Sequence, residues 1–363
     1  MTVAILVLVV GLAAANGSND VPKGVATLAG AGVTRYRTAI VWGTVATLGG
    51  SLVSLQLADR LAELFSTGTV TATPTPAFAL AVLAGTAAWV AFATATKLPV
   101  STTHAIVGSL VGAGLLLTAG AVNFEALPTR VAVPLLLGVG VAYLVSMVLN
   151  LLPQRIPECV CLSLENPVVA PVVDPQAAGV LAAPVSLPIP KVTTGTMADC
   201  GVHGSSSGRL GFTVNGAHWL SSGATSFARG LNDTPKIVAV GAFALVPAGM
   251  TIHQILVVVA AAMAAGSILG GMRIAHRLGE GVVKMSHVEG FRANLTTALL
   301  VGFAANRGLP LSTTHVSTGA IAGAAGKDTS RLHTRTLRDF LIAWTLTPLI
   351  AGALAAAIFA VFR

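Results

Sequence analysis

The chain of 363 residues contains few charged side chains. Asp, Glu, Lys and Arg make up 9% of it, whereas hydrophobic residues make up 54%. A soluble domain usually carries about 25% charged residues. Because the mean hydropathy is +0.82, a soluble fold would expose apolar surface that it has too few polar residues to cover. The composition therefore excludes an ordinary soluble protein and predicts that the chain folds in a lipid bilayer.

Cysteine is also scarce, with Cys159, Cys161 and Cys200 as its three occurrences. Neither the C-x-C pair nor His203 near the third cysteine matches a strong zinc-binding spacing, so we expect loop thiols in a reducing compartment, with no metal centre and no cofactor. The net charge is +8, but the basic residues are scattered over short loops, which argues against nucleic acid as a partner. No basic segment precedes the first apolar run, which we interpret as a retained membrane segment rather than a signal peptide.

Apolar runs of membrane-spanning length recur in both halves of the chain. They cover residues 2–33, 38–57, 77–96, 100–118, 131–150, 211–249, 251–272, 294–306, 310–326 and 339–362. The first and the 211–249 run are too long and contain polar residues and proline, which predicts broken helices. The short runs 294–306 and 310–326 predict a re-entrant hairpin, which is tolerated at membrane depth only where protein or a wet cavity covers it. The predicted fold class is an all-α polytopic membrane protein.

The segment between the two sets of runs has a different composition. Eight prolines lie between Pro153 and Pro190, and Gly and Ser follow around residues 204–208. Such a segment predicts a solvent-exposed loop or a small irregular insert. We therefore predict three parts: a transmembrane half at 1–150, the insert at 151–210, and a second transmembrane half at 211–363.

The two transmembrane halves share two sequence motifs in the same order. The segment 17–26, GSNDVPKGVA, matches 230–239, GLNDTPKIVA, at seven of ten positions. The segment 98–104, LPVSTTH, matches 309–315, LPLSTTH, and the following Gly108 and Gly112 match Gly319 and Gly323. The two motifs lie 82 residues apart in the first half and 80 in the second, measured from the Asn to the first Ser. Internal repeats of this kind are typical of secondary transporters.

Loop charge reverses between the two repeats. The turn at 34–37 carries two arginines, whereas the matching turn at 249–251 carries no charge; conversely, the loops at 273–292 and 327–338 are strongly basic and their counterparts at 58–76 and 119–130 are not. Basic loops face the cytoplasm. This pattern predicts inverted-topology repeats in the plasma (inner) membrane, with the N- and C-termini outside and the 151–210 loop cytoplasmic.

Asp20 and Asp233 lie inside apolar runs. A carboxylate at the bilayer centre costs at least about 2.5 kcal/mol, so each requires a partner or a wet cavity. Each could pair locally with Lys23 or Lys236, three residues along one helix face, and such pairs would be purely structural. Because the costly cluster occurs twice in corresponding places, we favour one shared binding site.

The residues around the two aspartates suit ion binding. Pro22 and Pro235 each remove a backbone donor. A broken helix offers N–H groups to an anion and carbonyls to a cation. Asn19 and Asn232 supply both a donor and an acceptor.

Three consecutive hydroxyls follow a proline in each Pro-x-Ser-Thr-Thr-His segment. Proline favours a helix start and Ser or Thr caps it, so helix capping and interhelical hydrogen bonding would explain them. Three hydroxyls at a helix N-terminus also resemble a cradle for a tetrahedral oxyanion, and two facing cradles would surround one ligand. For His104 and His315 we favour a structural role, and a role in proton transfer stays open.

At these residues the chain resembles the inorganic phosphate transporter (PiT) family of cation-coupled symporters, over residues 1–150 and 211–363. The resemblance implies an inverted-repeat fold in which two hairpins and two broken helices hold phosphate at mid-membrane. It implies that phosphate contacts the six hydroxyls of the motifs, Ser101, Thr102, Thr103, Ser312, Thr313 and Thr314. It places Asn19, Asp20, Asn232 and Asp233 beside them, binding phosphate or coupling cations. The implied partners are inorganic phosphate, Na⁺ or H⁺ and the bilayer, and a homodimer is left open.

The chain departs from the family pattern after each Asn-Asp-x. The family usually has a small residue and then Asn, whereas this chain has Pro22-Lys23 and Pro235-Lys236. Lys23 and Lys236 would replace sodium, bind the anion directly, or neutralise the aspartates. If they only neutralise the aspartates, a phosphate of about −1.5 to −2 charge needs about two further positive charges, from sodium or protons.

The favoured function is secondary active transport of inorganic phosphate by alternating access, coupled to Na⁺ or H⁺. Sulfate or another tetrahedral oxyanion would fit the same fold, although free carboxylate acceptors favour phosphate, which can donate a hydrogen bond. An intramembrane enzyme with a Ser or Thr nucleophile near His104 or His315 is disfavoured, because the sequence contains neither an H-E-x-x-H motif nor a nucleophile elbow. A channel is disfavoured because buried charge pairs suit an occluded site better.

Overall fold

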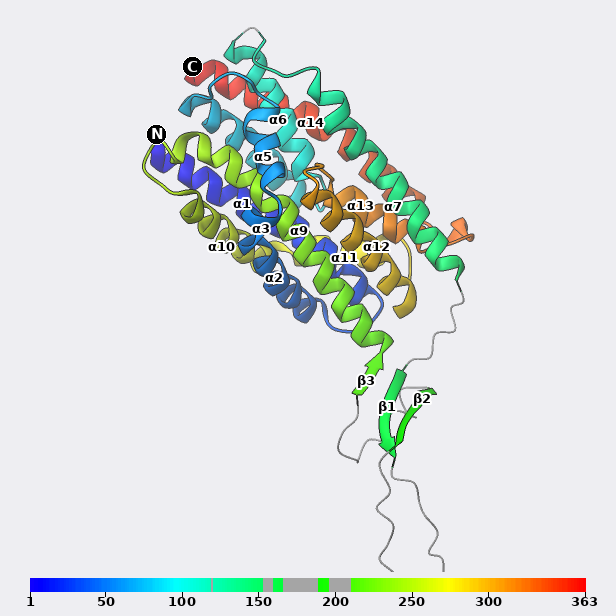
Figure 1. Ribbon diagram of the computed structural model, residues 1–363. Helices are drawn as coiled ribbons and strands as arrows, with labels where there is room; N and C mark the ends of the chain where they lie inside the picture. The colour runs from blue at the N-terminus through cyan, green and yellow to red at the C-terminus, as the bar shows by residue number, and fades with distance from the viewer. Residues whose placement is uncertain (119, 153–158, 166–188, 196–209) are drawn as a thin grey trace, which may run out of the picture. The chain divides into compact units, whose positions relative to one another are not determined.

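The computed structural model describes residues 1–118, 120–152, 159–165, 189–195 and 210–363. They form two compact units, one of residues 1–154 and 218–363 and the other of residues 155–217. The first unit is helical, and the described strands belong to the second (Figure 1). Five helical segments of the described chain are long and apolar enough to cross a membrane: Thr2–Gly30, Pro76–Ala95, Leu127–Leu151, Ile252–Gly270 and Thr334–Phe362.

The first half of the chain contributes the helices that precede the insert. These are α1 (Thr2–Gly30), α2 (Tyr36–Leu52), α3 (Ser54–Leu57), α4 (Asp59–Glu63), the π-helix η1 (Leu64–Gly68), α5 (Pro76–Ala95), α6 (Thr102–Leu117), the π-helix η2 (Leu127–Ala132) and α7 (Val133–Leu151). The second half contributes α9 (Val214–Leu245), α10 (Ile252–Gly270), α11 (Met272–Gly281), α12 (His287–Asn306), α13 (Thr313–Gly323), the 3₁₀-helix η3 (Thr329–Arg331) and α14 (Thr334–Phe362).

The prediction of broken helices at Pro22 and Pro235 is wrong at the level of secondary structure. Both α1 and α9 continue through their proline, as Figure 1 shows. A proline removes one hydrogen bond of the helix ladder. Neighbouring helices that pack around the segment hold the remaining turns in place, and this is how membrane helices tolerate internal prolines.

The described residues of the insert add strands to a fold that is otherwise all-α, as predicted. These residues form a three-stranded antiparallel sheet in the order β2 (Ile189–Gly195), β1 (Cys159–Glu165), β3 (Leu210–Thr213). A further difference is α11, which occupies a stretch predicted as a loop. It is a short amphipathic helix with Ile274, Ala275 and Leu278 buried. Its ten residues are too few to cross a membrane, so the pattern of apolar runs does not predict it.

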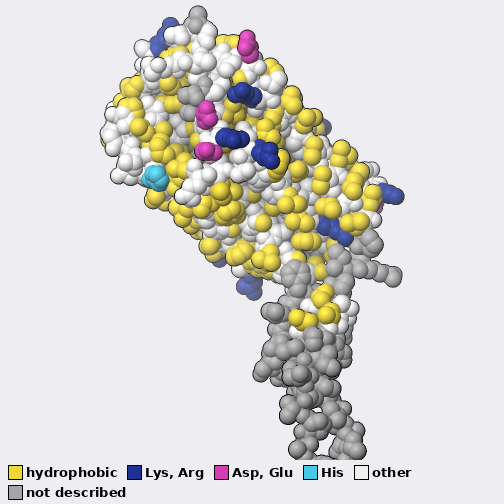
Figure 2. Space-filling view, in the orientation of Figure 1, with side chains coloured by type: hydrophobic (Ala, Val, Ile, Leu, Met, Phe, Trp, Pro, Cys, Tyr) yellow, Lys and Arg dark blue, Asp and Glu magenta, His cyan; other side chains and the backbone are white. Residues whose placement is uncertain are grey.

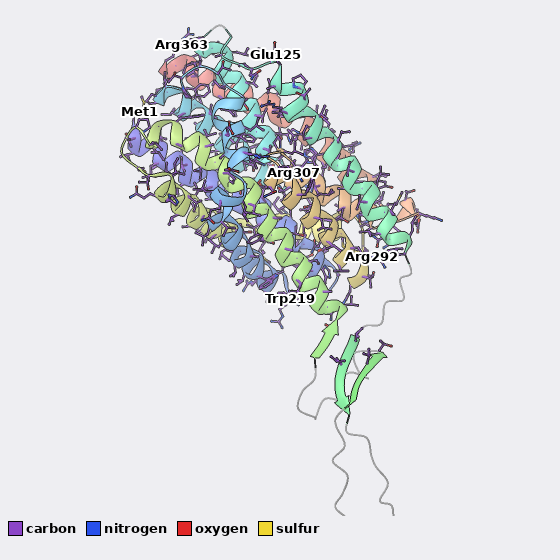
Figure 3. The ribbon with its side chains drawn as sticks, in the orientation of Figure 1. Met1, Glu125, Trp219, Arg292, Arg307 and Arg363 are labelled. Atoms are coloured by element: carbon purple, nitrogen blue, oxygen red, sulfur yellow. The ribbon has the colours of Figure 1, made fainter. Side chains whose placement is uncertain are left out.

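Helices α5 and α6 form a hairpin, as do α12 and α13. A serine caps the second helix of each hairpin, Ser101 before α6 and Ser312 before α13. Its side chain accepts a hydrogen bond from the backbone N–H three residues later. The turn before each serine contains one residue with a positive φ, Lys97 at 63° and Gly308 at 70°. In Figure 3, Arg307 lies midway along the helical unit and Arg292, near the start of α12, lies toward one end. The α12–α13 hairpin thus turns back in the middle of the unit.

The start of α12 is fixed by Glu289. Its carboxylate accepts from the Ser286 backbone at 2.7 Å and from Arg331 Nη1 at 2.8 Å. Burial raises the pKa of Glu289, but the hydrogen bonds from Arg331 and Ser286 outweigh it, so the pKa lies below the ordinary value. The ion pair ties the first turn of α12 to the segment that leads into α14.

The second helix of each hairpin packs against the last helix of the other half. Helix α6 packs on α14, and α13 packs on α7. The four glycines of the repeated motif make these contacts: Gly108 meets the Pro348 backbone, Gly112 meets Gly352, Gly319 meets Val139 and Gly323 meets Tyr143. Small residues let two helix backbones approach closely. The two halves are therefore interlocked.

Apolar side chains fill the space between the helices and also cover the outside of the helical unit. The largest buried cluster joins α1, α5, α6, α9, α10 and α14, with Val9, Phe78 and Phe359 among its members. Figure 2 shows a face that is mostly hydrophobic or uncharged, with sparse charged side chains apart from one small mixed group. Such a surface suits a hydrocarbon environment.

Candidate functional site

Four chain segments meet in one buried polar cluster inside the helical unit. The two Asn-Asp-x-Pro-Lys motifs lie within α1 and α9, and the two Ser-Thr-Thr-His motifs open α6 and α13. The charged side chains of the cluster are almost fully buried, at 1% exposure for Asp20, Lys23 and Lys236 and 2% for Asp233. Buried charges at this depth persist only when other groups pair with them or hydrogen-bond to them.

Asp20 bonds both to its own helix and to the first hairpin. One carboxylate oxygen accepts from Lys23, and the other accepts from Thr102 Oγ1 at 2.8 Å and from Asn16 Nδ2 at 2.5 Å. The local lysine pair considered from the sequence is thus present. The same carboxylate also holds the N-terminus of α6, so the pair belongs to a larger network.

Each lysine reaches a hydroxyl on the hairpin of the opposite half. Lys23 Nζ donates to Thr314 Oγ1 at 2.5 Å, and Lys236 Nζ donates to Thr103 Oγ1 at 2.7 Å. Thr103 and Thr314 occupy equivalent positions of the repeated motif, as do the two lysines. The two bonds are therefore reciprocal and cross-link the repeats inside the helical unit.

Asn19 connects α1, and Asn232 connects α9, to the hairpin turn of the same repeat. Asn19 Nδ2 donates to the Leu98 carbonyl at 3.0 Å, and Asn19 Oδ1 accepts from Val100 N at 3.2 Å. Asn232 Nδ2 donates to the Leu311 carbonyl at 3.0 Å. Its own oxygen, Asn232 Oδ1, is buried and has no hydrogen-bond partner among the described residues. Asn19 uses its whole amide to position a hairpin, whereas Asn232 keeps an unused acceptor.

Two members of the cluster, Asn16 and Arg229, did not emerge from the sequence analysis. The side-chain amide of Asn16 lies 2.5 Å from Asp20 Oδ2 and 3.5 Å from Asp233 Oδ2, so it bridges the two carboxylates. Arg229 is 1% exposed; its guanidinium donates to Asn16 Oδ1 at 3.3 Å and to Asp233 Oδ2 at 3.4 Å. Arg229 could have been predicted as a site residue, because a charged residue inside the 211–249 apolar run indicates a functional position.

Asn16 and Arg229 are the residues that precede the two copies of the first motif, so they occupy equivalent positions of the repeat. They are also bonded to each other. Because one is an amide and the other a cation, this position is where the two repeats differ most within the cluster. With Arg229 included, the cluster holds three cationic side chains and two carboxylates, a formal excess of one positive charge: Lys23, Lys236 and Arg229 against Asp20 and Asp233.

The six hydroxyls of the two hairpins are all buried, but several already have partners. Ser101 and Ser312 cap their helices by accepting from the His104 and His315 backbone N–H groups, both at 3.2 Å. Thr102 donates to Asp20, and Thr103 and Thr314 accept from the lysines. Thr313 is buried at the position equivalent to Thr102. An anion can enter this cluster only by replacing some of these bonds.

His104 and His315 bring the two hairpins into direct contact. Their rings stack with centroids 4.5 Å apart, and the His315 ring lies 3.9 Å from that of Trp344. Because the histidines are equivalent positions of one motif, the stack lies between the two repeats. The contact brings together the N-termini of α6 and α13.

The cysteines fall in the part of the sequence assigned to the second unit, residues 155–217. Cys159 and Cys161 belong to β1, whereas Cys200 and His203 lie outside the described residues. Among the residues that the structure describes, no group of three or more His, Cys, Asp or Glu side chains is arranged to hold a metal ion.

Two interlocked repeats around one buried cluster of charges and hydroxyls define a polytopic transporter rather than an enzyme. Residues 16–355 match the model of the phosphate transporter family, so the chain belongs to that family and is an integral membrane protein.

Similar proteins cover nearly the whole chain. A probable low-affinity inorganic phosphate transporter of Mycobacterium leprae is 26% identical over 94% of this chain and 73% of its own length. A protein of Rhizobium meliloti with the same description is 25% identical over 94% of this chain and 90% of its own. A solved structure entitled "The sodium-dependent phosphate transporter" superposes with a TM-score of 0.78 at 20% identity, covering 99% of this chain and 98% of that one. The last comparison establishes the fold.

Proposed function

We propose that this protein carries inorganic phosphate across the membrane by alternating access, and that the central cluster is its binding site. The observation that supports this best is the reciprocal pair of bonds, Lys23 to Thr314 and Lys236 to Thr103. These bonds bring two ammonium groups and two hairpin hydroxyls into a cluster to which both repeats contribute. Ammonium and hydroxyl donors at helix N-termini suit a tetrahedral oxyanion.

Phosphate binds in this proposal by replacing the lysine–threonine bonds. Each lysine then donates to a phosphate oxygen, and the Thr103 hydroxyl, which accepts from Lys236, can donate its own hydrogen to the anion. Thr314 keeps its bond to the Val100 carbonyl at 2.7 Å. The carboxylates of Asp20 and Asp233 accept a hydrogen bond from a protonated phosphate oxygen. Every group that leaves a partner gains a charged one, so the exchange leaves no buried group without a partner.

The charge of the cluster determines how many coupling cations are needed. Its formal excess of one positive charge balances a phosphate monoanion without any added cation. The dianion leaves one negative charge, which one proton or one sodium ion neutralises. Arg229 thereby supplies one of the two additional charges expected from the sequence, and the proposed coupling falls to a single Na⁺ or H⁺ per dianion.

The interlocked hairpins provide the moving parts for alternating access. Helices α6 and α13 approach the site from the two repeats and meet at the His104–His315 stack. Separating them on one side at a time would open the site alternately. In the proposed orientation both termini lie outside and residues 151–210 lie in the cytoplasm; Met1 and Arg363 lie toward the same end of the helical unit in Figure 3.

The proposal is tested by uptake of radiolabelled phosphate into proteoliposomes, with sodium and proton gradients imposed separately. We expect uptake driven by one of the two gradients, and counterflow of labelled phosphate against unlabelled phosphate. Absence of uptake under both gradients and of counterflow would contradict the proposed function.

Sulfate is tested in the same assay, because one observation weakens the expected preference for phosphate. Both aspartates are paired with cations, Asp20 with Lys23 and Asp233 with Arg229 and Lys236. Paired carboxylates are weaker acceptors for the P–OH group that distinguishes phosphate from sulfate. We expect excess sulfate to compete poorly with labelled phosphate, and efficient competition would identify a general oxyanion carrier.

A further inference from the structure

A second group of cations surrounds a cavity beside the tip of the α5–α6 hairpin. The cavity has a volume of about 550 Å³ and is lined by Lys97 from the hairpin and by residues of α11, including Met272, Arg273, His276, Arg277 and Glu280. We call it the basic vestibule. Its volume is ample for a hydrated phosphate.

Two cations of the vestibule have no ion-pair partner among the described residues. Arg277 pairs with Asp339 at 3.2 Å, and Glu280 accepts from the Tyr36 hydroxyl at 2.9 Å. Lys97 and Arg273 have no such ion pair in the described part of the chain, and both are exposed to the cavity side. Two unpaired cations in a concave site favour an anion.

The backbone at Lys97 is an independent sign that its side chain is required. Its φ is 63°, the left-handed region that L-residues rarely adopt and that costs about 1–2 kcal/mol. The second repeat has Gly308 at the equivalent position with φ of 70°. Glycine adopts this conformation without strain, and strain of this kind is concentrated at functional sites.

The vestibule borders the central cluster. Leu98, the residue after Lys97, accepts from Asn19 through its carbonyl, and Val100 accepts from Lys23 at 2.8 Å. The hairpin tip therefore carries the vestibule lysine on one side and contacts the buried site through its next residues. At the tip of the other hairpin, Gly308 packs against Arg60, which lies on α4 between the acidic residues Asp59 and Glu63.

We infer that Lys97 and Arg273 form a second, peripheral anion site that holds phosphate in the basic vestibule on its way to or from the central cluster. This inference rests on the proposed phosphate transport. The site is solvated, so its affinity is lower than that of the central cluster and falls as ionic strength rises.

Equilibrium binding of radiolabelled phosphate to the purified full chain in detergent tests the inference. The wild type should bind two phosphates per chain at low ionic strength, and the weaker one should be lost at high salt. Lys97→Gly should bind one; since glycine suits this backbone conformation, the variant is expected to fold. Arg273→Gln should weaken the second phosphate at least tenfold, whereas Arg307→Gln, at the tip of the other hairpin, should keep both.

Each outcome separates the two proposals. A single phosphate per chain in the wild type, or two in the Lys97→Gly/Arg273→Gln double variant, overturns the peripheral site and leaves the central one intact. No bound phosphate in the wild type overturns the proposed function itself. In uptake assays Lys97→Gly should raise KM about 5- to 10-fold with kcat within about twofold, and should flatten the dependence of kcat/KM on ionic strength; an unchanged KM and salt dependence overturns the inference.

Discussion

Single side chains carry the charge balance on which the transport proposal depends. Asp20 bonds to Lys23 of its own helix and to Thr102 of the first hairpin, whereas Asp233 bonds to Arg229 of its own helix and to Asn16 of the other repeat. Removing one carboxylate leaves a buried cation without its partner, which typically costs about 3–5 kcal/mol. Effects on transport and on folding must therefore be measured together.

We expect Asp20→Asn and Asp233→Asn each to lower the initial rate of phosphate uptake at least about 50-fold, because each removes an acceptor and unbalances the cluster. Uptake into proteoliposomes measures the rate, and size-exclusion elution with thermal unfolding confirms that folded protein was reconstituted. Asp328→Asn, which changes an exposed carboxylate, serves as the control and should transport normally. Wild-type rates in either buried variant would exclude these residues from the mechanism.

Arg229 is expected to set the cation requirement. Arg229→Asn gives the second repeat the residue type that the first has at Asn16 and removes the formal charge excess of the cluster. We expect uptake without sodium at neutral pH to fall at least about tenfold, since every tenfold change corresponds to only about 1.4 kcal/mol, and to recover in part when sodium or protons are added. Initial rates over a sodium series and a pH series test this. A cation dependence identical to that of the wild type would show that Arg229 does not replace a coupling ion.

At the scale of helices, the contacts of α6 with α14 and of α13 with α7 hold the two repeats together. A Cβ added at Gly108 would overlap the Pro348 backbone, and one at Gly319 would overlap Val139. By contrast, a Cβ at Gly140 meets nothing within 4 Å. The glycines of the repeated motif therefore have no room for a side chain, whereas Gly140 does.

Gly108→Ala and Gly319→Ala should each destabilise the protein by about 1–3 kcal/mol, because overpacking forces the helices apart. Gly140→Ala should instead stabilise it by about 0.5–1 kcal/mol, because alanine loses less entropy in a helix. Thermal unfolding in one detergent compares the three variants with the wild type. Equal shifts at all three positions would mean that these helix contacts do not determine stability.

At the scale of the whole molecule, the proposed inverted orientation of the repeats predicts that their equivalent turns face opposite sides of the membrane. Thr34 lies in the basic turn between α1 and α2, and Ala248 lies in the uncharged turn between α9 and α10. Single cysteines at these positions would be introduced after Cys159, Cys161 and Cys200 are replaced by serine. The pair offers a matched test of topology.

We expect an impermeant maleimide to label Ala248→Cys in intact cells and Thr34→Cys only after the membrane is opened, because basic turns stay in the cytoplasm. Labelling after denaturation controls for expression of both variants. If both cysteines react from the same side, the repeats are parallel and the proposed mechanism of alternating access loses its structural basis.

Much of the fold could be predicted because the decisive patterns are local. Long apolar runs predicted the membrane, and two repeated motifs predicted a duplicated unit and contained the asparagines, aspartates, lysines and hydroxyls that meet in the cluster. The broken helices were predicted wrongly because the local cost of Pro22 and Pro235 is offset by packing from other helices. Helix α11 and the small sheet were missed because short elements lack a strong periodic signal.

The sequence by itself determined that the chain belongs in a membrane and that costly buried charges occur in two equivalent places. Only the tertiary structure decided how those places are joined, as in the bond from Lys23 to Thr314, 291 residues away, rather than to the equivalent Thr103. The two threonines have the same local surroundings, so no local pattern can choose between them. The choice, like the position of Arg229 between the two aspartates, follows from how the helices of one repeat pack against those of the other.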